Sequence, residues 1–219
     1  MKNIIFIHKQ ANTVPFVLLF GIYASLGYDP LGSAFFWWLQ KEDGLLENLS
    51  VIFLIIASLT FALSGFLSKA INNQQKIIFY LMSLTFFVWA GEEISWGERL
   101  FNYSNDFISS HNAQGETTVH NLKLIQPFLP YAYCMIFSAF SLLSLSSVYR
   151  KKFYFWQPDG TLFYFFSILA GYYGLGIILS YFPEVSSAPF DNQELYEFVF
   201  AAGIAIYSYD VFNILNEQS

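Results

Sequence analysis

The chain has 219 residues, of which 55% are hydrophobic and 12% are charged, and its formal net charge is −6. Ordinary soluble domains are less apolar and carry about twice this fraction of charged residues. The composition therefore excludes a typical soluble globular domain and makes a lipid bilayer the expected solvent.

Apolar stretches long enough to cross a bilayer recur along the whole chain. A hydrocarbon core of about 30 Å requires roughly 20 apolar helical residues per crossing. We predict six such helices, at Asn12–Tyr28, Leu45–Ser68, Ile77–Trp96, Leu124–Val148, Leu162–Phe182 and Leu195–Leu215. No linker or charge block separates them, so we expect an all-α polytopic transmembrane bundle that forms one integral membrane domain over residues 1–219. The first stretch is also compatible with the start of a signal peptide.

The basic residues predict the orientation of these helices, because lysine and arginine beside membrane spans stay on the cytoplasmic side. Seven of the ten fall in the tail or loops that six spans with a cytoplasmic N-terminus leave inside: Lys2, Lys9, Lys69, Lys76, Arg150, Lys151 and Lys152. Lys41, Arg99 and Lys123 remain for the outer side. We therefore predict that both termini are cytoplasmic.

Acidic residues gather at the opposite, outer ends of the predicted helices. Glu47 begins the second helix, Glu92 and Glu93 end the third, and Glu194 and Glu197 begin the sixth. Outer loops are often acidic, but a charge within a span costs about 2.5 to 3.5 kcal/mol at its centre and less near its end. Three helix ends thus bring carboxylates to one level, where they favour a bound cation or an arginine partner.

The most specific local pattern, residues 91–100, leads the third helix out of the membrane. On a continuous helix Glu92, Trp96 and Arg99 share one face, because offsets of four and seven residues return to the same side. Arg99 is also the single arginine expected on the outer side. The competing interpretation is an exit collar, in which Trp96 marks the interface and the charges solvate the helix end.

A second group of candidate residues follows in the loop after this helix. If the chain is helical from Glu116, then Glu116 and His120 lie on one face at a spacing suited to metal ligands. Together with Glu47 and Glu93, they form a predicted site for a divalent ion such as Mg²⁺, Mn²⁺, Fe²⁺ or Zn²⁺. A surface pair of glutamate and histidine is the alternative.

Two motifs resemble a family of bacterial integral membrane proteins that has no assigned reaction. They are Gly-Glu-Glu-Ile-Ser-Trp-Gly at 91–97, with Arg99 after it, and Gln-x-Glu-x-x-x-His-Asn at 114–121. The resemblance runs from Glu42 to Asn121 and implies a multi-pass protein of the bacterial inner (plasma) membrane. It also implies one functional set, made of Glu92, Glu93, Arg99, Glu116, His120 and Asn121.

A comparison with CAAX-type prenyl proteases is weaker. Glu92 and Glu93 begin like their Glu-Glu-x-x-x-Arg motif, but the arginine position is occupied by Gly97. Arg99 comes two residues later, which turns a helix by about 200°. The later histidine motifs of that family are also missing.

These patterns favour a membrane-embedded enzyme that acts on a lipid-linked or headgroup substrate at the outer leaflet. In this hypothesis Glu92 or Glu93 is the general base or a metal ligand, Arg99 orients an anionic group, and His120 is a ligand or proton donor. An ion-binding or transport protein and a structural or sensory subunit of a membrane complex are the alternatives. We expect the bilayer as a partner and no nucleic acid, and no oligomeric state follows from the sequence.

Overall fold

The computed structural model describes residues 44–69, 71–101, 103–113, 115, 117–150, 162–182 and 193–217. The predicted helix Asn12–Tyr28 and the candidate ligand Glu116 lie outside these ranges. Within them the secondary structure is helical, and one isolated bridge between Asn112 and Leu122 is the sole extended pairing. The all-α fold class is therefore confirmed for the part of the chain that the structure describes.

Five long helices make up most of the fold: α3 (Leu45–Leu67), α4 (Asn73–Glu93), α7 (Leu129–Arg150), α8 (Leu162–Ser180) and α9 (Gln193–Glu217). Shorter helices lie between α4 and α7: η1 (Ser95–Gly97), α5 (Glu98–Phe101), α6 (Asp106–His111) and η2 (Gln126–Phe128). Each long helix overlaps one of the predicted spans. Hydropathy thus located the long helices correctly.

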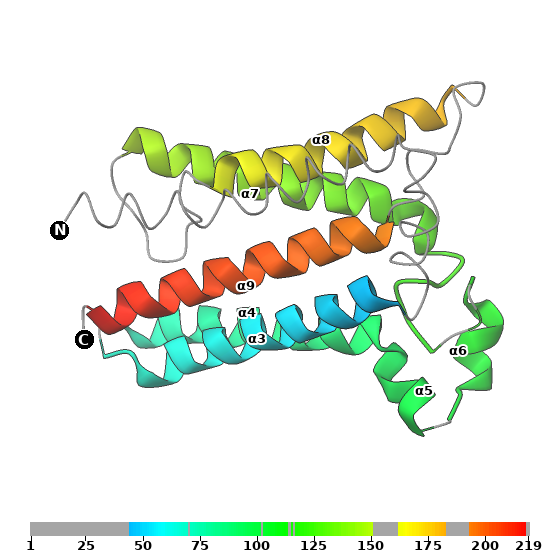
Figure 1. Cartoon of the computed structure of the whole chain (residues 1–219), viewed down its shortest axis with the longest axis horizontal. Helices are drawn as coiled ribbons and strands as arrows, with labels where there is room; N and C mark the ends of the chain where they lie inside the picture. The colour runs from blue at the N-terminus through cyan, green and yellow to red at the C-terminus, as the bar shows by residue number, and fades with distance from the viewer. Residues whose placement is uncertain are drawn as a thin grey trace.

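The long helices lie side by side along the longest axis of the molecule (Figure 1). Helix α3 packs against both α4 and α9, while α7 packs against α8. At one end of the bundle α4 and α8 finish and α3, α7 and α9 start, and α5 and α6 project beyond it. We call this the capped end, and we call the described residues of 103–125 the cap.

Local sequence explains how two of these helices begin. Asn72 accepts a hydrogen bond from the Gln75 backbone N–H at 3.0 Å, and the Gln75 side chain accepts one from the Asn72 N–H at 2.8 Å. This reciprocal capping box satisfies donors that the first turn of α4 leaves open. Helix α7 starts at Leu129, later than predicted, because Pro127 and the following residues form η2 first.

Aromatic rings join the two helix groups through the centre of the bundle. The Phe200 ring of α9 lies 4.8 Å from Trp89 of α4 and 5.1 Å from Phe137 of α7. Serine pairs add hydrogen bonds between helices, between the hydroxyls of Ser58 and Ser83 at 3.2 Å and between those of Ser141 and Ser167 at 2.6 Å. Packed rings and small polar pairs of this kind hold helices together where no water is available.

The outside of α3 and α4 is strongly apolar. Exposed side chains there include Ile52, Ile55, Ile56, Leu59, Leu63, Phe66, Ile77, Ile78, Leu81, Leu84, Phe87 and Val88. By length and composition two described helices are able to cross a membrane, Leu45–Leu67 with a mean hydropathy of 2.3 and Glu194–Asn216 with 1.6. The six crossings, the cytoplasmic termini and the inner-membrane location stay predictions.

The third predicted helix, Ile77–Trp96, ends earlier than expected, and the prediction that Glu92, Trp96 and Arg99 share one face of a continuous helix is wrong. Helix α4 ends at Glu93, and the next turn contains Ser95, Trp96 and Gly97 with φ of 49°, 55° and 79°. These left-handed values break the ladder of helical hydrogen bonds. Arg99 lies in the separate helix α5, so it does not share a helix face with Glu92.

The prediction of a helix from Glu116 to His120 is also wrong for the residues described there. Residues 117–119 are irregular and His120 lies in a turn. Carboxylates of Glu98 and Glu92 accept the backbone N–H groups of Thr117 and Val119, as described below, and these contacts hold the segment in its irregular course.

Candidate functional site

The turn after α4 is built by the Gly91–Gly97 motif. The Trp96 ring folds back over Gly91, where an added Cβ would lie 2.8 Å from Trp96 Cζ3. Trp96 Nε1 donates to Glu92 Oε1 at 2.6 Å, which fixes the ring. Gly97, with φ of +79°, closes the turn in a conformation that glycine adopts without strain. The two glycines and the tryptophan of the motif therefore have a structural explanation.

The second oxygen of Glu92 binds the cap. Glu92 Oε2 accepts from the Val119 N–H at 2.7 Å and from the His120 N–H at 3.1 Å. It also lies 3.2 Å from His120 Nδ1, and since an ionised carboxylate only accepts, this nitrogen carries the proton. Glu92 and His120, two members of the predicted functional set, thus contact each other in an arrangement that fixes the backbone of the cap.

Glu98 holds a neighbouring part of the cap. Its Oε2 accepts from the Thr117 N–H at 2.7 Å, and Thr117 Oγ1 in turn accepts from the Asn105 N–H at 3.2 Å. Asn112 Nδ2 donates to Thr118 O at 2.8 Å and lies 2.9 Å from Thr118 Oγ1. The carboxylates of Glu92 and Glu98, one on each side of the turn, thus fix the backbone of the cap.

Glu98, Thr117 and Thr118 are structurally important in the cap, although no sequence pattern predicted a role for them. Thr117, Thr118 and Asn112 are all buried, although the chain around them is short of apolar residues. A cluster of small polar residues, here Ser, Asn and Thr over 102–121, is the signal that indicates such a folded loop.

Glu93 points to the other side of α4, into the bundle. Its side chain is 7% exposed, and its Oε1 accepts from Trp89 Nε1 at 2.9 Å. The carboxylates of Glu194, Glu47 and Glu92 all interact electrostatically with it. Helix α4 therefore presents a buried acid to the start of α3 and the start of α9.

Helix α9 adds a second buried acid to this region. Glu197 is 6% exposed, and the hydroxyl of Tyr133 on α7 donates to Glu197 Oε1 at 3.5 Å. Tyr133 also interacts electrostatically with Glu93, and its ring stacks on that of Trp89 with the centroids 5.9 Å apart. We call Glu47, Glu93, Glu194 and Glu197 the carboxylate group.

The structure divides the predicted metal ligands between these two surroundings. His120 contacts Glu92 in the cap, whereas Glu93 and Glu47 belong to the carboxylate group. Among the residues that the structure describes, no three histidine, cysteine, aspartate or glutamate side chains are arranged to hold a metal ion. Glu116 and the Arg99 side chain lie outside the description, so the divalent metal site stays a prediction.

No protein-family model matches the chain, and no curated protein or solved structure shows significant similarity to it. The resemblance of residues 91–97 and 114–121 to a bacterial membrane protein family therefore stays a prediction. The function has to be inferred from the contacts of the site itself.

Proposed function

We propose that this chain is an integral membrane protein that binds a cation at the capped end of its bundle, through the carboxylate group. The side chains of this group have to move closer together on binding, because no three of them are arranged to hold a metal ion in the described structure. The observation that carries the proposal is the position of Glu93, buried in the bundle with Glu47 and Glu194 in electrostatic range. Carboxylates held close in surroundings of low dielectric repel one another unless they take up a cation or a proton. Carboxylate oxygens are the preferred ligands of hard cations.

The apolar exterior supports a membrane location. Two helices have the length and composition of membrane spans, and the outer faces of α3 and α4 expose large apolar side chains along their whole length. Soluble monomers rarely expose contiguous apolar surface on this scale. In a bilayer the same surface contacts lipid, and buried acids become candidates for function.

The contacts of Glu92 make it a poorer candidate for binding or catalysis than Glu93. Both of its oxygens already accept hydrogen bonds, from the Trp96 indole and from the backbone of the cap. A general base needs a free lone pair directed at its substrate. The enzymatic hypothesis with Glu92, Arg99 and His120, and its lipid-linked substrate, have no comparable support from the described contacts.

The test is cation binding by the full-length protein in lipid nanodiscs. Thermal unfolding would be followed by tryptophan fluorescence during titration with Na⁺, K⁺, Mg²⁺, Ca²⁺ and Mn²⁺. We expect saturable stabilisation by at least one of these ions, lost in Glu93→Gln and retained in Glu98→Gln. The control also removes one carboxylate, but from the cap. If no ion stabilises the natural chain, or if both variants respond alike, the proposal is wrong.

A further inference from the structure

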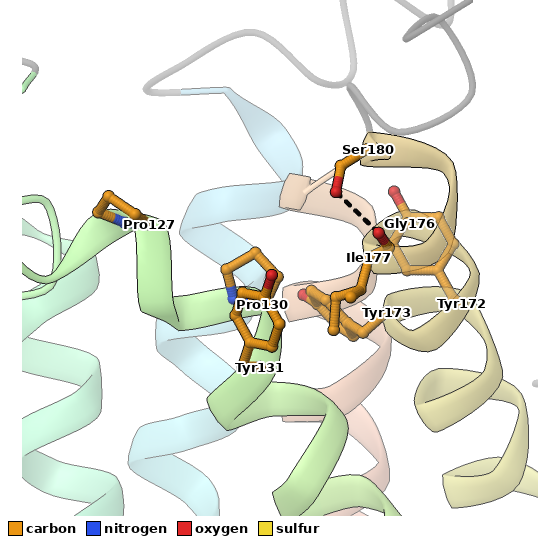
Figure 2. A pocket seen from close by; sticks show the side chains of 8 residues that line it. All are labelled: Pro127, Pro130, Tyr131, Tyr172, Tyr173, Gly176, Ile177 and Ser180. Atoms are coloured by element: carbon orange, nitrogen blue, oxygen red, sulfur yellow. Dashed lines mark hydrogen bonds between the residues drawn. The ribbon is translucent and has the colours of Figure 1, made fainter. Parts of the chain in front are cut away.

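A cavity of about 310 Å³ lies at the capped end, between the start of α7 and the end of α8. Figure 2 shows Pro130 and Tyr131 of α7 facing Tyr173 and Ile177 of α8 across it. Small-molecule sites in proteins have volumes of about 300 Å³ upward and are lined mainly by apolar and aromatic groups with a few polar ones. This cavity therefore has the size and lining of a site for a small ligand.

The aromatic part of the lining consists of tyrosines. Tyr131, Tyr172 and Tyr173 all contribute to the wall, and the hydroxyls of Tyr131 and Tyr181 lie 3.4 Å apart at the helix ends. The face of a tyrosine ring carries negative electrostatic potential and attracts cations within about 6 Å of its centroid. The lining thus favours a positively charged ligand that also has apolar surface.

The carboxylate group lies behind one wall of this cavity. Tyr173 lines the cavity, and its ring lies at a tilt 5.0 Å from that of Tyr133, whose hydroxyl donates to Glu197. The charges of Glu197 and Glu93 both act on Tyr173. Because the intervening groups are buried and poorly screening, these charges extend a negative potential into the cavity when the carboxylate group is ionised and holds no inorganic cation.

We propose that this cavity binds an organic ammonium ion, with its cationic group against Tyr131 and Tyr173 and its apolar substituents along Pro130 and Ile177. The inference rests on the proposed function only through the charges of Glu93 and Glu197. The aromatic wall of the cavity distinguishes this site from the carboxylate group. A small inorganic cation prefers carboxylate oxygens, whereas an alkylammonium ion is stabilised by ring faces and apolar contacts. Such a group occurs both in free amines and in lipid headgroups.

The test uses tetraethylammonium, titrated into the full-length protein in nanodiscs of phosphatidylglycerol and followed by isothermal calorimetry. We expect saturable binding that is weakened about 10-fold by Tyr131→Leu, which removes a ring face, and little changed by Tyr131→Phe, which keeps it. Tyr131 is 42% exposed, so neither variant disturbs the core. Absence of binding to the natural chain, or equal affinities in the two variants, would overturn the inference.

Two further measurements separate the possible outcomes. Glu197→Gln is expected to weaken tetraethylammonium binding by removing charge behind the tyrosine wall, and an unchanged affinity would contradict the electrostatic part of the inference. Replacing phosphatidylglycerol with phosphatidylcholine distinguishes the sources: competition identifies a lipid headgroup, and no competition identifies a free amine. Inorganic cation titrations of Tyr131→Leu keep the two proposals distinct, because this variant retains the whole carboxylate group.

Discussion

Glu92 and Glu93 are neighbours in the sequence, yet they face different regions of the molecule. Glu92 faces the cap and accepts hydrogen bonds from the Trp96 indole and the backbone of Val119 and His120. Glu93 faces the bundle, where its donor is the neutral Trp89 indole and its strongest charged influence is Glu194. Adjacent side chains on a helix point about 100° apart, so one of these neighbouring residues faces the cap and the other faces the interior of the bundle.

In an apolar chain, the groups around a carboxylate distinguish a structural acid from a candidate binding acid. A carboxylate whose oxygens already accept several N–H groups is part of the fold, because removing it leaves those donors unsatisfied. A buried carboxylate that lies among other carboxylates needs a bound cation or a proton to offset their mutual repulsion. The two acids should therefore respond in opposite ways to substitution.

The largest effect is expected for Glu92→Ala. The indole of Trp96 and the N–H groups of Val119 and His120 lose their acceptor together, which costs about 3 kcal/mol of local stability. Amide exchange of residues 117–122 should then be on the order of 100-fold faster, as measured by hydrogen exchange and mass spectrometry in nanodiscs. Glu93→Ala should leave this exchange unchanged. Equal exchange in the two variants would show that Glu92 and Glu93 do not have separate roles.

An opposite change is expected for Glu93→Gln. The amide still accepts from Trp89, while one charge is removed from among Glu47, Glu194 and Glu92. The free energy of unfolding should rise by about 1 to 2 kcal/mol in a low-salt buffer without added metal ions, at an alkaline pH that keeps the Glu93 carboxyl ionised, as measured by denaturation in mixed micelles. Glu98→Gln should give no such gain. A loss of stability in Glu93→Gln would indicate that a cationic group of the protein already stabilises the charge.

A smaller effect on the cap is expected for Gly91→Ala. The new methyl group would lie 2.8 Å from Trp96 Cζ3, so the ring has to move and its bond to Glu92 weakens. We expect a loss of about 1 to 2 kcal/mol and faster exchange in the same cap residues as for Glu92→Ala. Gly171→Ala is the matched control, because a Cβ there meets nothing within 4 Å. Since alanine favours a helix more than glycine does, Gly171→Ala should lose no stability, and similar losses in both variants would show that the effect at Gly91 does not come from Trp96.

The long helices and the meeting of carboxylates at one level followed from the sequence. Hydropathy marks apolar helices because their backbone must be satisfied internally, and α3 and α9 begin within a few residues of the predicted positions. Glu47 lies in the first turn of α3 and Glu93 ends α4. Because α3 and α4 are consecutive antiparallel helices joined by a short loop, the start of α3 and the end of α4 lie at the same end of the bundle. The proximity of Glu47 and Glu93 could therefore be predicted without knowing the structure of the loops.

The break after α4 and the pairing of Glu92 with His120 did not follow from the sequence. Gly97 is the one conventional signal of a break, since Ser95 and Trp96 are ordinary helix residues when taken alone. Their left-handed backbone depends on the contact of the Trp96 ring with Gly91. The Glu92–His120 contact joins residues 28 positions apart and depends on the whole cap, which no local pattern encodes.

The smallest effect is expected for Glu98→Gln. The glutamine amide oxygen still accepts from the Thr117 N–H, and only the charge of the acceptor is lost. We therefore expect a loss of about 0.5 to 1 kcal/mol in local stability and amide exchange a few-fold faster at Thr117. Site-resolved hydrogen exchange would show whether the change stays at Thr117 and its partner Asn105. If it does, Glu92 and Glu98 hold separate parts of the cap. If exchange also rises at Val119 and His120, the cap opens as one cooperative unit. The loss measured for Glu92→Ala then reports the stability of the whole cap and not the bonds of Glu92 alone.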